Sequence, residues 1–198
     1  IGIVIAGVRS TYDKTADTAR PTFGRQVLGF FHGFCKVYLT VLRGTPVVVQ
    51  LMIIYFVIFA WSDNGIMVAA LAFGLNSGAY VAEIVRGGIM SIDPGQMEAG
   101  RSLGMKYPTV MKDIIIPQAI KNILPALCNE GIAVLKETSI VGLISVVDLT
   151  RASDLVRSRT LSPYFPLIAV AIVYYILVAG LSAGVSAMER RMAQSDRH

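Results

Sequence analysis

The sequence is poor in the residues that form metal, disulfide and nucleophilic sites. Among its 198 residues there are only two cysteines, Cys35 and Cys128, and two histidines, His32 and His198. The cysteines lie far apart and lack metal-ligand spacing, so we interpret both as small apolar packing residues. Both histidines lie outside the apolar runs, which excludes an intramembrane serine protease because that enzyme needs a base beside its serine.

Three further absences narrow the possible functions. There is no G-x-x-x-x-G-K-[ST] loop, so the chain does not itself hydrolyse ATP through such a motif. The segments RGTP and NSGAY are not repeated, whereas a secondary transporter driven by an ion gradient would need internal repeats. Basic residues are not interleaved with aromatic ones, so the net charge of +5 does not indicate binding to nucleic acid.

Apolar residues are abundant and lie in long runs. They make up 54% of the chain, and the mean hydropathy is +0.61. Long apolar runs are typical of insertion into a bilayer. The first run, Ile1 to Val8, is too short to cross a membrane, and we expect it to be the tail of a transmembrane helix that begins before Ile1. It lacks the basic region and cleavage site of a signal peptide.

The remaining pattern predicts one all-α membrane domain over residues 1–198. After a polar loop at 9–36, four spans are expected at about 37–61, 66–89, 120–147 and 164–187, with a charged loop at 90–117 between the third and the fourth. The last run is long enough to cross about 30 Å of hydrocarbon with some tilt. It contains Gly180 and Gly184, a G-x-x-x-G pair that indicates either a close helix contact or chance in an apolar helix.

The distribution of lysine and arginine predicts the orientation. If the spans alternate, thirteen of the 18 basic residues fall on one side: Arg9, Lys14, Arg20, Arg25, Lys36, Arg86, Arg101, Lys106, Lys112, Lys121, Arg190, Arg191 and Arg197. The opposite side holds three (Arg151, Arg157 and Arg159), and two lie within spans (Arg43 and Lys136). The positive-inside rule therefore places the loop at 90–117 in the cytoplasm.

Polar residues within the third span indicate a path for a solute. Asn76, Tyr80 and Glu83 lie at i, i+4 and i+7 and so share one helical face, and Ser77 is small enough to admit a ligand. Hydrogen bonding between helices is the alternative interpretation. For Glu83 we expect an ion pair with Arg43, because the two lie at similar depth and the pair would leave neither charge alone in lipid.

Two acidic residues stand on one face of the fourth span. Glu130 and Glu137 are spaced i, i+7, with Lys136 beside them. They could hold the ammonium group of an amino acid, or they could form structural ion pairs with other helices. We favour the ligand role, because two acids and one base leave one acid unpaired.

The second span begins with RGTPVVVQ. Gly44 and Pro46 are expected to break its first turn, which frees backbone groups to line a cavity. Gln50 lies one turn further in and could bind a polar solute. A proline kink that serves only packing is equally compatible with this segment.

The charged loop carries the most specific pattern, EAGRSLGMKYPTVMKDIIIP from Glu98 to Pro117. Pro94 and Gly95 predict a turn, and Glu98 is expected in the first turn of the following helix. Gly104 is expected to allow either a tight turn or a close approach by another protein. Pro117 is expected to break the second helix of the loop. The structural alternative is an ordinary interfacial helix.

This loop resembles the EAA loop of ATP-binding-cassette importer permeases, whose pattern is E-A-A-x3-G-x9-I-x-L-P. The matching residues are Glu98, Ala99, Gly104, Ile114 and Pro117, while Gly100 stands in place of alanine and Ile116 in place of leucine. RGTPVVVQ, NSGAYVAEIVRGG, IPQAIKNILPAL and LKETSIVGLISVVDLTR further resemble the polar amino acid permeases of this class. Glu137 departs from them, since aspartate is common there.

The resemblance implies a type I importer transmembrane domain with five transmembrane helices and a cytoplasmic coupling helix. It implies a bacterial cytoplasmic membrane protein that is not an enzyme and has no cofactor of its own, because ATP is bound by a separate ATPase dimer. Further implied partners are a second permease subunit, identical or homologous, an extracytoplasmic solute-binding protein and an amino acid substrate. In such a system Glu98 to Gly104 would transmit ATPase closure to the spans.

Overall fold

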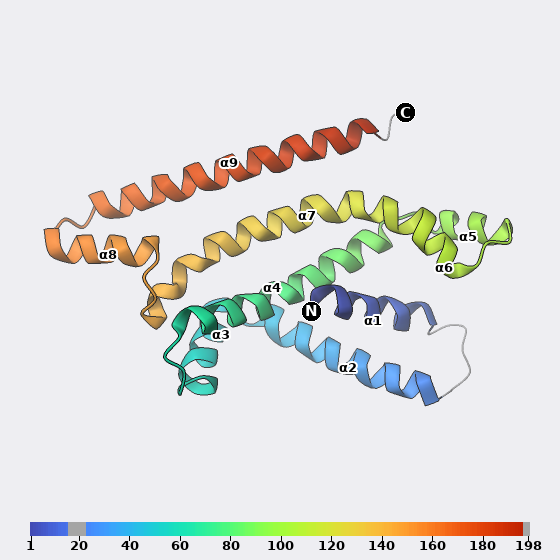
Figure 1. The fold of residues 1–198 in the computed structure, drawn as a ribbon, viewed down its shortest axis with the longest axis horizontal. Coiled ribbons are helices and arrows are strands. Elements are labelled where there is room, and N and C mark those ends of the chain that lie inside the picture. The colour runs from blue at the N-terminus through green and yellow to red at the C-terminus, as the bar shows by residue number, and fades with distance from the viewer. Residues whose placement is uncertain (16–22, 196–198) are drawn as a thin grey trace. The chain divides into compact units, whose positions relative to one another are not determined.

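The computed structural model describes residues 1–15 and 23–195, and in that part of the chain every regular element is a helix. Figure 1 shows the helices in order: α1 (Gly2–Thr15), α2 (Phe23–Gly44), α3 (Val47–Ile53), α4 (Gly65–Met90), α5 (Pro94–Ser102), α6 (Tyr107–Val110), α7 (Ile116–Glu137), α8 (Leu149–Thr160) and α9 (Phe165–Ser195). Two π-helical segments, Ile54–Ile58 and Met111–Ile115, extend α3 and precede α7, and a 3-10 segment, Thr138–Ile144, follows α7. Arg20 and Arg197, which the sequence assigned to cytoplasmic segments, lie outside the described residues.

The chain divides into two compact units. Unit 1 comprises Ile1–Val41 and Gly78–Cys128, and unit 2 comprises Leu42–Ser77 and Asn129–His198. The long helices α2, α4 and α7 each pass from one unit to the other.

In unit 1, glycines allow α4 to contact its neighbours closely. A Cβ atom on Gly2 of α1 would lie 2.7 Å from the carbonyl oxygen of Gly78, and one on Gly88 would lie 2.2 Å from Cγ1 of Ile123 in α7. Both distances are too short for a side chain. At Gly2 the two backbones approach each other, and at Gly88 the side chain of Ile123 packs on the glycine backbone, as small residues allow between membrane helices. Near the second contact, Asn122 Nδ2 donates to Ser91 Oγ at 2.9 Å.

Unit 2 contains a continuous apolar core. Its buried members come from α3, the π-helical segment after it, the first half of α4 and the 3-10 segment: Leu51, Ile54, Val68, Ala69, Ala72, Phe73, Val141 and Ile144. At the far end of this unit, α8 and α9 lie side by side as an antiparallel pair (Figure 1). Asp148 caps α8 by accepting from the amides of Thr150 and Arg151.

Among the described residues, two helices are individually long and apolar enough to cross a membrane, α4 and α9. They cover the expected third and fifth spans, 66–89 and 164–187. The helices over Val27–Gly44 and Val47–Ile58 qualify as a bent pair, with an angle of 109° between them. In α7, which starts the expected fourth span, Lys121, Glu130, Lys136 and Glu137 interrupt the apolar run.

Two expected boundaries are wrong. The region 9–36 is not a polar loop, because α1 continues to Thr15 and α2 already begins at Phe23. The fourth span does not remain α-helical to 147, because the α-helix ends at Glu137 and the chain reverses at Ser145, whose φ is 63°. Both errors have one cause, since charged residues were taken to mark a loop and apolar residues to mark a helix.

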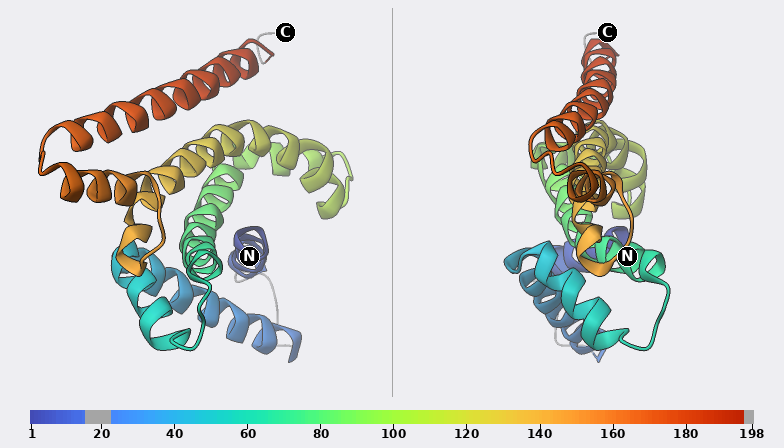
Figure 2. Two further views of the ribbon diagram at one scale, coloured as in Figure 1. Left: turned by 60° about the vertical axis from the view of Figure 1, so that its left-hand side comes forward. Right: turned by 90° about the vertical axis from the view of Figure 1, so that its left-hand side faces the viewer.

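The expected break at the start of the second span is confirmed. Figure 2 shows the chain turning sharply between α2 and α3. Pro46 is the N-cap of α3 and has extended backbone angles, φ −63° and ψ 136°. Gly44 ends α2, so the two residues named from the sequence flank the turn. The bend falls where proline removes a backbone donor and glycine leaves the turn sterically open.

Candidate functional site

The loop after α4 forms a short helix with a well-defined start. Asp93 is the N-cap of α5, and its carboxylate accepts a hydrogen bond from the amide of Gly95 at 2.8 Å. Pro94 occupies the first helical position, where its missing N–H costs nothing. The expected place of Glu98 is therefore wrong by one turn: the helix begins at Pro94 itself, and Glu98 lies in its second turn, exposed to solvent.

The end of α5 is fixed by Gly104, as the sequence predicted. Its φ is +80°, a conformation that glycine adopts without steric cost. The amide of Gly104 donates to the carbonyl of Arg101, and the amide of Met105 donates to that of Gly100. These two bonds form a Schellman motif, so Gly104 both stops the helix and directs the chain into α6.

The contact between α5 and α6 explains why Gly100 replaces the alanine of the family pattern. Gly100 is buried, and a Cβ atom at this position would lie 2.7 Å from Cγ2 of Val110. Val110 is completely buried. Its branched side chain therefore fills the space that an alanine methyl group would need, and the two residues act as a matched pair.

We expect Gly100→Ala to lower the melting temperature of the protein, and Gly100→Ala combined with Val110→Ala to restore most of it. Overpacking a buried contact costs about 1–3 kcal/mol, of which about 1 kcal/mol is recovered because alanine favours helix. Gly87→Ala is the matched control, since a Cβ there meets nothing within 4 Å. Thermal unfolding of the purified protein in detergent tests this; equal melting for both single variants would refute the matched pair.

The chain from α6 into α7 is continuously helical, so the expected break at Pro117 is wrong. Met111–Ile115 forms a π-helical segment, in which the amide of Ile116 bonds to the carbonyl of Met111. The wider turn immediately before Pro117 offers room for the proline ring. The backbone hydrogen-bond pattern of the π-helical segment also tolerates the missing N–H of Pro117. Ile114 is half-buried in this segment.

An open hollow lies beside α5. It has a volume of about 440 Å³ and is lined mainly by apolar side chains, with Asp93 and Glu98 as its acidic members. Met97 of α5, Met90 and Tyr107 are among the apolar residues of its wall. Glu98 thus carries a carboxylate at the wall of an apolar depression, while Ala99 beside it is exposed. This surface has the shape and chemistry to receive a protruding side chain of another protein.

In unit 2 the structure brings Gln50 and Asn76 together. Both are buried, at 7% and 3% exposure, and Asn76 Nδ2 donates to Gln50 Oε1 at 2.9 Å. Gln50 Nε2 in turn donates to the carbonyl of Leu42 at 2.8 Å and to the carbonyl and hydroxyl of Thr45 at 2.9 and 2.8 Å. The two amides therefore satisfy backbone groups that the break after α2 sets free.

We expect Gln50→Leu to destabilise the fold markedly. The substitution leaves the carbonyls of Leu42 and Thr45 and the amide of Asn76 with fewer partners, at a cost of about 1–3 kcal/mol for each group left buried and unsatisfied. Gln118→Leu is the control, because Gln118 is exposed and bonds only the carbonyl of Ile114 in its own helix. A melting temperature unchanged by Gln50→Leu would show that this network does not support the bend.

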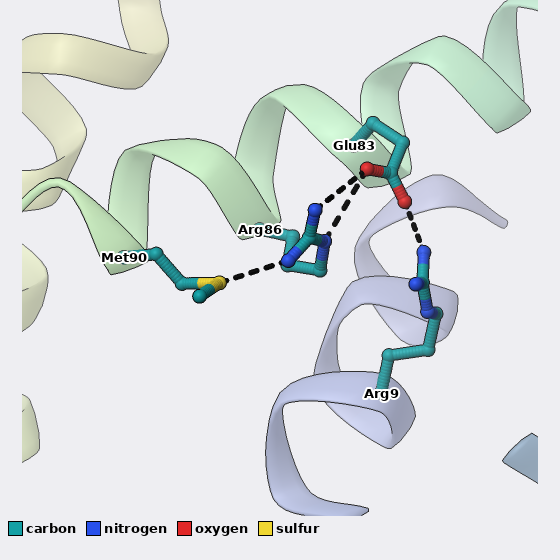
Figure 3. A network of polar contacts seen from close by, with 4 residues as sticks. All are labelled: Arg9, Glu83, Arg86 and Met90. Carbon is teal, nitrogen blue, oxygen red and sulfur yellow. Dashed lines mark hydrogen bonds and ion pairs between the residues drawn. The ribbon is translucent and has the colours of Figure 1, made fainter. Parts of the chain in front are cut away.

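Glu83 binds two arginines (Figure 3). One carboxylate oxygen accepts from Arg9 Nη1 of α1, and the other accepts from Arg86 Nη2 at 3.0 Å and Nε at 3.3 Å. The sequence treated Arg9 as a loop residue, so its pairing with Glu83 was missed; the extension of an apolar helix through residue 9 was the available signal. The expected pair of Arg43 and Glu83 joins residues of the two different units and stays a prediction.

Glu130 and Glu137 lie in unit 2, at the last two turns of α7. Both are half-buried, and within the described residues neither carboxylate has a hydrogen bond or an ion pair. Glu137 is the last α-helical residue, where the helix dipole disfavours negative charge. The helix end therefore disfavours the charge of Glu137, and the adjacent Lys136 is the cation nearest to it in sequence.

The other expected path residues are divided between the units. Ser77 is half-buried at the end of one segment of unit 2, and Tyr80, with 36% exposure, lies in unit 1. Among the expected path residues, Gln50 and Asn76 are joined by a hydrogen bond. Cys35 is buried and Cys128 half-buried, and both are free thiols, as expected for packing residues.

An exposed polar pair of short helices between apolar helices, a broken span and charged residues within long helices are compatible with a membrane permease, and comparisons with known proteins show that class. The family of binding-protein-dependent transport system inner membrane components matches residues 23–194. The chain belongs to this family. It is a transporter subunit and not the catalytic subunit of such a system, and the family membership implies an ATPase and a binding protein as partners.

Relatives with assigned substrates are similar over most of the chain. A putative glutamine transport system permease of Rickettsia conorii is 41% identical over 162 residues, which are 80% of this chain and 74% of that protein. The arginine transport system permease of Bacillus subtilis is 40% identical over 185 residues, covering 86% of this chain and 84% of that protein. These similarities confirm the predicted class, the polar amino acid permeases of ABC importers.

Solved structures confirm the fold. An amino acid ABC transporter crystallised with histidines is 40% identical, with a TM-score of 0.83 over 96% of this chain and 83% of that one. An inward-facing methionine ABC transporter is 16% identical, with a TM-score of 0.74 over 96% of this chain and 87% of that one, and shows the shared fold alone. The predicted all-α type I importer domain is therefore correct.

Proposed function

We propose that this chain is the translocating subunit of an importer that carries a polar amino acid across the bacterial cytoplasmic membrane. The observation that carries the amino acid assignment is the pair of unpaired, half-buried carboxylates of Glu130 and Glu137 on one face of α7. The ammonium group of an amino acid would offset one of these two negative charges. The names of the relatives, which transport glutamine and arginine, agree with this chemistry.

In this proposal Asn76, Ser77, Tyr80 and Gln50 belong to the path along which the substrate moves. Gln50 and Asn76 already form a hydrogen bond with each other. Their part is therefore to stabilise the bend between α2 and α3 beside the path. The freed backbone at that bend then lines the path, which is where irregular backbone is tolerated within a membrane.

The proposed assembly contains a second permease subunit, an ATPase dimer and a solute-binding protein. ATP is bound by the ATPase, so the permease needs no cofactor of its own. The residues that couple the permease to the ATPase are those of the loop pattern: Glu98 and Ala99, which are exposed on it, and Gly100, Gly104, Ile114 and Pro117, which shape it. On α9, Gly180 and Gly184 leave open space where a Cβ would stand, which suits a close contact with the second permease.

ATP hydrolysis in proteoliposomes tests the proposal. The permease is reconstituted with its ATPase, and hydrolysis is measured with empty binding protein and with binding protein loaded with single amino acids. We expect stimulation by the loaded protein only, and the amino acids that stimulate define the substrate. Failure of the ATPase to bind the permease would overturn the docking role of the loop; stimulation independent of any amino acid would overturn the substrate class.

A further inference from the structure

The ion-pair network of Arg9, Glu83 and Arg86 contains more positive charge and more donors than its one carboxylate can match. Each guanidinium has five N–H groups, whereas a carboxylate offers about four acceptor sites. Within this trio, two positive charges meet one negative charge. Figure 3 shows Glu83 of α4 between Arg86 of the same helix and Arg9 of α1.

Two of the surplus donors have poor partners or none. Arg86 Nη1 donates to the thioether sulfur of Met90 at 2.9 Å, and sulfur of this kind is a weak acceptor. The Nε of Arg9 is buried and has no hydrogen-bond partner. A buried guanidinium N–H without an acceptor costs free energy. An anion would be stabilising at the exposed parts of the two guanidinium groups, where it would offset the positive charge that Glu83 leaves over.

The network lies near the cytoplasmic end of the membrane-spanning region. Arg86 is four residues before Met90, the last residue of α4, and the charged coupling loop follows directly. The lysine and arginine distribution places this end in the cytoplasm. The guanidinium groups are thus within reach of lipid headgroups, with side-chain exposures of 19% for Arg9 and 27% for Arg86.

An apolar hollow occupies the same depth along α4. Its volume is about 390 Å³, and its wall is formed by Ile3 of α1, Val85 and Ile89 of α4, and apolar residues of α7 such as Ile120 and Leu124. Val85 directly precedes Arg86 in α4, and Ile89 lies about one turn after it. The same helices therefore present surplus cationic donors and a hydrocarbon-lined depression.

From this combination we infer that the cytoplasmic ends of α1 and α4 bind one anionic phospholipid of the inner leaflet. The phosphate accepts hydrogen bonds from Arg9 and Arg86, and part of an acyl chain occupies the hollow between α1, α4 and α7. Glu83 stays paired with both arginines and holds them in place. Basic pockets between membrane helices on the cytoplasmic side have the chemistry that recognises such headgroups.

A soluble phosphate would bind the arginines but would not fill the hollow, whereas a phospholipid would do both. This difference distinguishes the two possible ligands. The test uses the purified permease–ATPase complex, stripped of lipid in detergent and then titrated with phosphatidylglycerol or with phosphatidylcholine of the same acyl chains. Bound lipid is counted by native mass spectrometry. The variants are Arg9→Gln, Arg86→Gln and, as control, Arg159→Gln, which removes an exposed guanidinium from α8.

We expect one phosphatidylglycerol per permease, preferred over phosphatidylcholine, and about fivefold weaker retention for each of the two network variants. Arg159→Gln should retain the lipid as the wild type does, and inorganic phosphate should not displace it. Arg9→Gln leaves Glu83 paired with Arg86, so the complex stays folded for this comparison.

Three results would overturn the inference. Equal binding of the two lipids would remove the role of charge. Wild-type retention of phosphatidylglycerol by both network variants would remove the role of these arginines. Displacement of the lipid by inorganic phosphate would assign the arginines to a soluble anion instead.

Discussion

Glu98→Lys should abolish ATP-driven uptake while the protein still inserts into the membrane and folds. Glu98 is exposed on the second turn of α5 and makes no contact within the described residues that the fold depends on. A surface change of this kind alters the free energy of unfolding by no more than about 0.5 kcal/mol. At a docking surface, by contrast, reversal of a charge that pairs with the partner costs about 2–5 kcal/mol.

The measurement combines uptake in proteoliposomes with the affinity of the permease for its ATPase in detergent. We expect affinity to fall at least about tenfold and uptake to fall with it. Glu189→Lys is the matched control, because it makes the same charge reversal at an exposed residue near the C-terminal end of α9. Normal uptake by Glu98→Lys would contradict the docking role of α5.

Gly104→Leu should give the same loss by another route. Leucine at a φ of +80° is strained by about 1–2 kcal/mol, and the Schellman bonds to Arg101 and Gly100 would be distorted. The strain falls on the loop rather than on a transmembrane helix. A variant that takes up substrate normally would show that the direction of the chain after α5 does not matter for coupling.

The coupling loop shows what local patterns in the sequence can predict. Gly104 and the break between Gly44 and Pro46 were predicted correctly because each depends on the backbone freedom of one or two residues. The helix start at Pro94 was missed because Pro94 and Gly95 occur in turns as well as at helix N-termini. Asp93 as N-cap was the feature that distinguishes the two cases.

The contacts between helices were harder to predict, for a physical reason. Helical periodicity places residues on a face but does not say which helix that face meets. Glu83 was expected to need a cation. Arg86 is three residues along the same helix, whereas the identity of Arg9 as a partner depends on how far α1 extends and where it packs. In the same way, Gln50 and Asn76 could be named as polar residues of the spans, but their mutual bond depends on the angle of the bend.

The close contacts of glycines with other helices could not be predicted from the sequence for the same reason. The replacement of the usual alanine by Gly100 was recognised, but its cause is the side chain of Val110, ten residues further along and folded back against it. Gly88 has an equally close contact with Ile123. Such matched pairs follow from the packing of two helices and leave no periodic signal in either one.

Glu130→Gln and Glu137→Gln should each weaken uptake of the transported amino acid about tenfold or more, mainly through a higher KM. Glutamine keeps the shape of the side chain and removes its charge, so the loss corresponds to a charge-assisted hydrogen bond of about 1.5–3 kcal/mol. Uptake kinetics in proteoliposomes measure this effect. Asp154→Asn is the control, because Asp154 is an acid on α8 that pairs only with Arg157 on the surface.

The melting temperature distinguishes this ligand role from a structural one. If the acids were partners of basic residues in other helices, removing one charge would leave a buried cation unpaired and lower stability by about 3–5 kcal/mol. Because neither carboxylate has such a partner in the described residues, we expect the glutamine variants to be as stable as the wild type or more stable. A higher KM at unchanged or raised stability identifies a cation supplied by the substrate, whereas lower stability at unchanged KM would place both acids in the scaffold.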